Sequence, residues 1–179
     1  MSESLQALYE GDVARARELL PPDAELTIFE AAAFGRVGRL REILAAEPSQ
    51  VTALSADGFT ALHLAIFGDE GEAARVLIEH GADVNQLSTS TIAQVPPLGT
   101  AAFVGSIPLA RLLLDAGADV NGHERSGFTA LHAAAENDDR DLVRELLARG
   151  ASREIRTAEG KTAADLAVSD DLRRLLAPR

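Results

Sequence analysis

The chain has 179 residues, 46% of them hydrophobic, so it is long enough and apolar enough to bury a packed core. It contains no cysteine, which excludes disulfides, thiolate catalysis and cysteine-based zinc sites. Its formal net charge is −11, and this acidity argues against direct binding to nucleic acid, because phosphate recognition needs cations.

Two stretches of the chain bear on export and membranes. The N-terminal stretch MSESLQALYEGD has acidic residues where a secretory signal has basic ones, and it lacks a sustained apolar segment. Residues 84–110 are uncharged, but their Asn, Gln, Ser, Thr, Pro and Gly residues make the run too polar and too broken for a membrane helix. We therefore expect a cytoplasmic protein without a membrane segment.

The chain repeats its own sequence at a spacing of about 33 residues. The segment DGFTALHLA, residues 57–65, returns as SGFTALHAA at 126–134. The segment LIEHGADVN, residues 77–85, returns as LLDAGADVN at 113–121 and as LLARGAS at 146–152. A fixed period of this length predicts stacked units, each of which buries its apolar face against the next.

These matches divide the chain into six units. Their boundaries are 1–23, 24–56, 57–89, 90–125, 126–158 and 159–179. The first and last units are truncated, and we expect them to cap the stack by showing residues such as Glu18, Arg173 and Arg174 to water. All six units are predicted to form one domain over residues 1–179.

Each complete unit is predicted to form two short helices. In the third unit, apolar residues recur at helical spacing in 62–66 and again in 73–78. Gly81 lies where a helix ends in a left-handed residue, and Gly117 and Gly150 hold the same place in later units. Helices this short are unstable alone, so they must pack on neighbouring units.

The pattern G-x-T-A-L-H-x-A, the ending L-L-x-x-G-A-D-V-N and the period together resemble the ankyrin repeat. The resemblance covers nearly the whole chain. It implies an all-α fold, a solenoid of stacked helix-turn-helix units with projecting β-hairpin-like loops. It also implies recognition of a partner protein. Ankyrin repeats have no catalytic signature of their own, so we expect no enzymatic activity, no cofactor and no bound metal.

Two histidines, His63 and His132, raise the question of a metal pair or an acid–base pair. A whole unit separates them, which puts them on the order of 16–20 Å apart for helices packed at 8–10 Å, too far to share a ligand. The resemblance implies that each histidine instead hydrogen-bonds to its local threonine, Thr60 or Thr129. The position is filled down the chain by Glu30, His63, Gly99, His132 and Asp165.

Two other groups of polar side chains could indicate a metal site or a catalytic site. The acidic run DDRD, residues 138–141, falls at the start of a predicted helix, where carboxylates suit the positive end of the dipole better than they indicate a metal site. His123 lies in a loop near Asp119 and Glu124, and these three side chains define a hydrolase as an alternative function.

The phenylalanines carry most of the functional information. Phe34, Phe67 and Phe103 occupy one position in three consecutive units, and Glu136 fills it in the fifth. The resemblance implies that this position faces the concave surface, so we expect an exposed aromatic stripe, which marks an interaction site. A second position holds aromatic residues that either reach the partner or pack under the loops as core. The predicted partner-binding residues are Phe34, Phe59, Phe67, Val95, Phe103, Val104, Phe128 and Glu136.

Together these patterns predict a monomeric, non-catalytic interaction module that binds an unidentified protein on its concave face, without nucleic acid or membrane. The alternative is a dedicated inhibitory or stabilising subunit of one enzyme. The uncharged run supplies an apolar interface centre inside an acidic surface. Its lengthened loop, residues 86–96, either contacts the partner or is a tolerated insertion.

Overall fold

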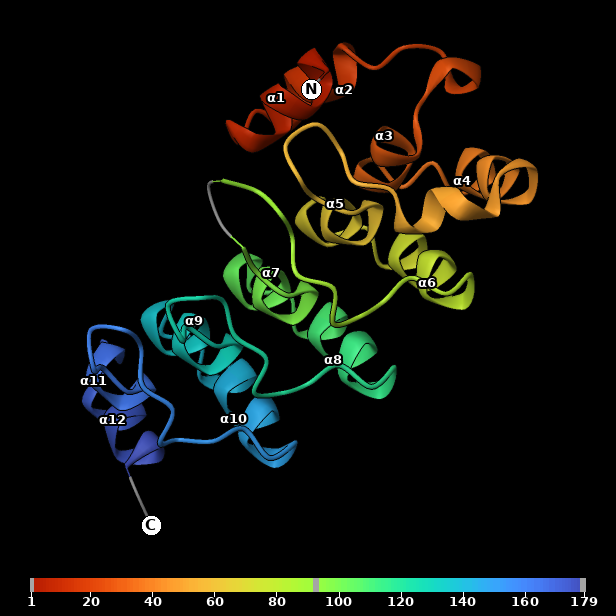
Figure 1. Ribbon diagram of the computed structural model, residues 1–179. Coiled ribbons are helices and arrows are strands. Elements are labelled where there is room, and N and C mark those ends of the chain that lie inside the picture. The colour runs from red at the N-terminus through yellow and green to blue at the C-terminus, as the bar shows by residue number, and fades with distance from the viewer. Residues whose placement is uncertain (1, 92–93, 178–179) are drawn as a thin grey trace. The chain divides into compact units, whose positions relative to one another are not determined.

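The chain forms successive antiparallel pairs of short α-helices (Figure 1). A computed structural model describes residues 2–91 and 94–177, which contain twelve α-helices and two short 3-10 helices. The all-α class predicted from the repeats is confirmed. The described residues divide into an N-terminal unit, 2–83 and 88–91, and a C-terminal unit, 84–87 and 94–177. The single domain expected over residues 1–179 stays a prediction.

The N-terminal unit holds three helix pairs. Its elements are α1 (Glu3–Tyr9), α2 (Val13–Glu18), the 3-10 helix η1 (Asp23–Glu25), α3 (Ile28–Ala33), α4 (Val37–Ala46), the 3-10 helix η2 (Pro48–Thr52), α5 (Ala61–Phe67) and α6 (Gly71–Glu79). Helix α3 packs between α1 and α5, and α4 packs on α6. The first helices of successive pairs therefore form one layer and the second helices another.

The C-terminal unit repeats this arrangement. Its elements are α7 (Pro97–Val104), α8 (Ile107–Asp115), α9 (Ala130–Glu136), α10 (Arg140–Ala148), α11 (Ala163–Leu166) and α12 (Asp170–Leu176). Helix α9 packs between α7 and α11, and α8 packs on α10. In Figure 1 the colours follow the chain from green to blue through these three pairs.

The core between the layers is built almost entirely from alanine and leucine. Leu62 and Leu77, on the two apolar faces predicted for the third repeat, are 1% and 0% exposed. Leu146 is fully buried at the corresponding place in the fifth. Alanines such as Ala65 and Ala134 are also fully buried, and their small side chains let short helices approach closely.

Glycine ends the second helices as predicted. Gly81 follows the last turn of α6 with φ of +89°, in the left-handed region that residues with a Cβ avoid. The next residue, Ala82, donates its N–H to the carbonyl of Leu77 at 3.0 Å, so the chain turns away with its carbonyls satisfied. Gly117 and Gly150 have φ of +93° and +91° and confirm the same role.

Hairpin-like closure of the loops is confirmed at two places. Antiparallel bridges join Leu54 to Thr60 and His123 to Thr129, at equivalent positions two repeats apart. Each bridge brings the chain back directly onto the N-cap of the next first helix, α5 or α9. The loops thus deliver the residues that begin each repeat.

Because Leu77 is fully buried on α6, Leu77→Ala should lower the free energy of unfolding by about 2–5 kcal/mol. Urea denaturation followed by circular dichroism measures the change. Leu87→Ala, at a side chain that is 42% exposed, is the control and should cost much less. Equal losses in the two variants would contradict this assignment of the core.

Candidate partner-binding surface

The two histidines in the repeated motif are structural, as the resemblance implied. The hydroxyl of Thr60 lies 2.7 Å from Nδ1 of His63, and that of Thr129 lies 2.8 Å from Nδ1 of His132. Each threonine is the N-cap of its helix, and each histidine is the third helical residue and only 1% exposed. The two histidines are two copies of the same N-cap interaction, rather than a metal-binding or acid–base pair.

The hydrogen bonds of His132 fix its charge state. Its Nδ1 accepts the N–H of Thr129 at 3.2 Å, so the ring proton is on Nε2, which donates to the carbonyl of Lys161 at 3.3 Å. Burial lowers the pKa of His132 below its ordinary value, against opposing hydrogen bonds to the backbone of Lys161 and Ile155. The neutral ring therefore links α9 to the loop of the following repeat.

Glu30 replaces histidine at this position in the first complete repeat. One carboxylate oxygen accepts the N–H of Thr27 at 3.0 Å and its hydroxyl at 2.8 Å, and the side chain is 5% exposed. Burial works to raise the pKa of Glu30, but hydrogen bonds from Ser2, Thr27 and Ser4 outweigh it and leave the pKa below its ordinary value. Glu30 thus ties the start of α1 to α3.

The loop around His123 is held together by its own polar groups. Nδ1 of His123 donates to the carbonyl of Glu124 at 2.8 Å. The carboxylate of Asp119 accepts the N–H of Asn121 at 2.9 Å, and that of Glu124 accepts the hydroxyl of Ser126 at 2.7 Å. These bonds make the three side chains loop supports, because the two carboxylates accept from Asn121 and Ser126 and the imidazole is bonded to a backbone carbonyl.

The acidic run at 138–141 starts a helix, as predicted. Asp139 is the N-cap of α10 and accepts the N–H of Leu142 at 3.0 Å. Asp138 adopts φ of +55° in the preceding turn and accepts the hydroxyl of Ser169 at 2.7 Å. Within residues 2–91 and 94–177, no three His, Asp or Glu side chains come close enough together to hold a metal ion.

The exposure expected for Phe34 is wrong. Its side chain is only 8% exposed, because α1 lies over this end of the first-helix layer and covers it. Phe34 belongs to a hydrophobic cluster with Leu5, Ala7, Leu8, Ala16, Ala33 and Leu64. At this end of the chain the position that the repeats share is therefore part of the core.

Phe67 is half-buried for the same reason, and Tyr9 is the residue that covers it. The two rings meet edge to face with centroids 5.2 Å apart, and the Tyr9 hydroxyl donates to Asp57 at 2.7 Å. Burial, then the bond to Asp57, raises the pKa of Tyr9 well above its ordinary value, so the phenol stays protonated. Leu5, Leu8 and Tyr9 have the i, i+3, i+4 spacing of an apolar helix face, and this pattern could have predicted that α1 covers the first-helix layer.

Phe59 and Phe128 lie beside the capping histidines. Both are half-buried, and their ring centroids lie 5.9 Å from His63 and 5.4 Å from His132. This contact favours the alternative in which these rings pack under the loops and shield the helix starts. Their contact with a partner stays a prediction.

Phe103 differs from the other two members of its row, because its side chain is 69% exposed at the end of α7. The amide of Asn137 donates to the carbonyls of Ala102 and Phe103, each at 3.2 Å, and so ties this end of α7 to the next repeat. Glu136 is exposed beside Asn137, and Val104 is half-buried. An exposed ring thus sits on a backbone whose carbonyls are held by Asn137.

The lengthened loop, 86–96, is partly packed against the preceding loop, and its residues 92 and 93 lie outside the described residues. Ser88 and Ser90 are 2% and 3% exposed, and the N–H of Thr89 donates to the carbonyl of Gly58 at 2.8 Å. A Cβ on Gly58 would lie 2.5 Å from the nitrogen of Ser90, so glycine permits this approach. Val95 is half-buried, and its contact with a partner stays a prediction.

Two models of known families match parts of the chain. A model described as "Ankyrin repeat" matches residues 57–89, which is the third unit deduced from the internal matches. A model described as "Ankyrin repeats (many copies)" matches residues 104–167. Together the two models cover more than half of the chain. Of the helices that the structure describes, none combines the length and the apolar composition that crossing a membrane needs.

Curated relatives share these repeats over most of the chain. Ankyrin repeat and SOCS box protein 3 of Bos taurus is 35% identical over 154 residues, 84% of this chain and 28% of that protein. The transient receptor potential cation channel subfamily A member 1 homolog of Caenorhabditis elegans is 30% identical over 149 residues, 83% of this chain and 12% of that protein. The chain therefore spans little more than a quarter of the first relative and about an eighth of the second.

Because the folded state keeps His132 neutral, acid should destabilise the protein through this residue. Its folded pKa lies below the ordinary value, so its contribution is complete above pH ~6.5 and is lost as the pH falls through the folded pKa. Between pH 7.5 and 5.5 the wild type should lose up to about 1.4 kcal/mol more than His132→Asn, measured by urea denaturation. His123→Asn is the control and should lose as much stability as the wild type over this pH range. Identical losses in the wild type and His132→Asn would refute the contribution of neutral His132 to stability.

Phe34 and Phe103, which hold the same position in their repeats, should lose very different amounts of stability on truncation to alanine. Phe34→Ala should cost about 3–5 kcal/mol of unfolding free energy, because it opens a cavity under α1. Phe103→Ala should cost less than about 1 kcal/mol, because its ring packs little in the folded protein. Thermal and urea melts of both variants measure the difference, and a similar loss in both would contradict the burial assigned to them.

Proposed function

The chain belongs to the ankyrin-repeat family, and we propose that it is a non-catalytic interaction module that binds a partner protein around Phe103. The observation that carries the proposal is the 69% exposure of Phe103, since the other phenylalanines are buried or half-buried. A large exposed aromatic is unfavourable in water, and aromatic anchors often dominate binding energy.

The surroundings of Phe103 support an anchor rather than a flexible surface residue. The bonds from Asn137 hold the last carbonyls of α7, and Gly105 ends the helix in the left-handed region with φ of +73°. The backbone that presents the ring is therefore ordered before binding, and less conformational entropy is lost on association. Glu136, exposed in the next repeat, supplies a charged rim for the apolar centre.

The charge of the chain suggests the character of the partner. With a formal net charge of −11, the protein attracts positively charged surfaces and repels acidic ones. We expect the partner to insert an apolar side chain against Phe103 and to place a lysine or arginine near Glu136. The proposal further takes the protein to be a cytoplasmic monomer, in keeping with the absence of cysteine.

Phe103→Glu should abolish retention of the partner in an affinity pull-down from source-cell lysate, because it places a charge at the apolar centre. Val13→Glu, at another exposed apolar side chain, is the control and should retain the same protein as the wild type. Both variants must first match the wild type in helicity and melting temperature. Retention of the same protein by Phe103→Glu would show that the partner does not bind at Phe103.

Once the partner is purified, Phe103→Ala should weaken binding by about 1–3 kcal/mol, which is roughly 5- to 150-fold in Kd. Isothermal titration calorimetry measures it.

A further inference from the structure

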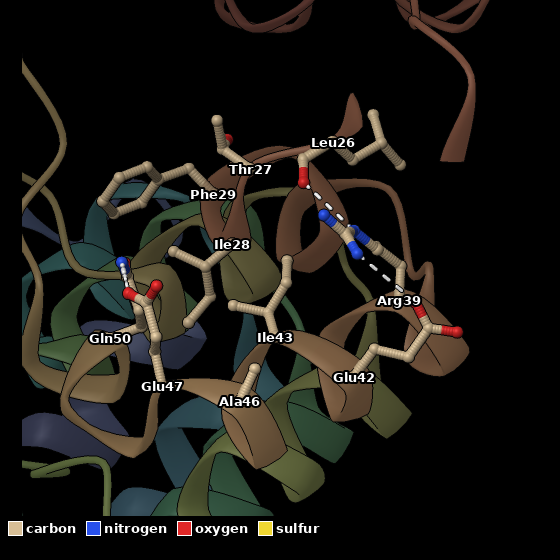
Figure 2. A pocket seen from close by; sticks show the side chains of 10 residues that line it. All are labelled: Leu26, Thr27, Ile28, Phe29, Arg39, Glu42, Ile43, Ala46, Glu47 and Gln50. Carbon is tan, nitrogen blue, oxygen red and sulfur yellow. Dashed lines mark hydrogen bonds and ion pairs between the residues drawn. The ribbon is translucent and has the colours of Figure 1, made fainter. Parts of the chain in front are cut away.

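A groove opens on the first complete repeat, between the start of α3 and the second half of α4 (Figure 2). Its volume is about 360 Å³. It lies wholly within the N-terminal unit, whereas Phe103 belongs to the C-terminal unit. We call it the α3–α4 groove, and it is separate from the surface proposed above.

The groove is apolar in its middle. Leu26 and Ile28, at 1% and 2% exposure, form its floor, while Phe29 and Ile43 are half-buried and Ala46 is exposed. Figure 2 shows Ile28 and Ile43 pointing toward each other from α3 and α4. The side chains that the two helices would bury against a neighbour are thus partly open to solvent.

The positions of Phe29 and Ile43 are both covered in the next repeat, whereas further along the chain Leu112 and Glu145, which correspond to Ile43, are half-buried. Leu62, Leu98 and Leu131 stand where Phe29 stands in the first complete repeat, and each is 1% exposed. Val76 stands where Ile43 stands and is fully buried in α6, which packs on α4. In the third repeat, this part of the face is therefore closed by the second helix of the preceding repeat.

The preceding repeat cannot close the groove because its second helix is too short. Helix α2 has 6 residues, whereas α4 has 10 and α6 has 9. Pro21 and Pro22 follow it, and proline both lacks the N–H that a helix needs and keeps its predecessor out of the helical region. The chain then continues to the short η1 turn, and part of the α4 face is left without a helix.

Both ends of the groove carry carboxylates. At one end, the guanidinium of Arg39 donates to the carbonyl of Leu26 and to Oε2 of Glu42, each at 3.3 Å, so Arg39 and this oxygen are paired and Oε1 of Glu42 is left to meet a partner. The Glu42 side chain is 70% exposed. At the other end, exposed Glu47 accepts only the neutral amide of Gln50, at 2.9 Å. A bound segment with cations at its ends would match this pattern.

We propose that the α3–α4 groove binds an amphipathic helix of a partner protein, with apolar residues along one face and lysine or arginine at its flanks. The occupant is a helix because α4 covers the corresponding position of α6, Val76, in the next repeat, and helix-in-groove docking uses anchors spaced at i, i+3 or i+4, and i+7. The flanking cations are set by Glu42 and Glu47. The bound helix completes the first repeat from outside the chain.

The test uses two synthetic stapled peptides of 16 residues that share a leucine face and differ only in their flanks, one with lysines and one with glutamates. Binding is measured by fluorescence anisotropy and mapped by backbone amide chemical shifts of the ¹⁵N-labelled protein. The lysine peptide should bind at least about tenfold more tightly than the glutamate peptide. The largest shifts should fall in residues 26–29 and 39–50.

Two neighbouring alanines on α4 provide a matched pair of variants. Ala46 lines the groove, whereas Ala45 is exposed on the same helix and does not line it. Ala46→Glu should weaken the lysine peptide at least about tenfold, and Ala45→Glu should leave it within about twofold. Glu47→Lys should reduce the ratio between the affinities for the lysine peptide and for the glutamate peptide. Phe103→Glu should leave the affinity for the lysine peptide unchanged. A failure of the groove proposal can therefore be told apart from a failure of the proposed function at Phe103.

Several outcomes would overturn the proposal. These are shifts that fall outside the groove, no binding of the lysine peptide at millimolar concentration, equal affinity for both peptides, or equal losses in Ala45→Glu and Ala46→Glu. Sedimentation velocity provides one more check. A concentration-dependent dimer that Ala46→Glu abolishes would assign the groove to a second copy of the chain, and the partner helix would be wrong.

Discussion

The whole structure depends on the stacking of helices that are too short to stand alone. Most have 6 to 10 residues, and α11 has only 4. Such helices gain too few internal hydrogen bonds to offset the entropy of ordering, so each must bury an apolar face on both of its neighbours. Alanine and leucine meet this demand, because small and branched side chains alternate between closely approaching layers.

A row of polar side chains at the helix starts reinforces this stacking. At the third position of four first helices, Glu30, His63, His132 and Asp165 each pair with the threonine that begins the helix. The first three are buried and Asp165 is exposed, and Gly99 interrupts the row in the fourth repeat. These bonds satisfy N–H groups that a helix start leaves open. His132 and Glu30 reach further, to Lys161 and to Ser2 and Ser4, so local caps also connect adjacent repeats.

The surfaces suited to binding arise where stacking is incomplete or altered. Helix α1 carries Leu5, Leu8 and Tyr9, and it covers the phenylalanine position that we expected to be exposed. Helix α2 is too short to cover the neighbouring face of α4, which leaves the α3–α4 groove. One capping repeat thus removes one apolar surface and opens another.

The sequence was sufficient to predict much that depends on neighbours along the chain. It predicted the helix pairs and the glycines that end them, because each is decided within a few residues. The internal matches gave the period, and the resemblance to the ankyrin repeat implied the threonine–histidine pairs. It did not predict which phenylalanines are exposed. Phe34 and Phe103 hold the same place in their repeats, yet one is 8% exposed and the other 69%. Exposure depends on what packs above a side chain, and only the tertiary structure decided that α1 covers Phe34 and that the face of α4 beside the short α2 stays partly open.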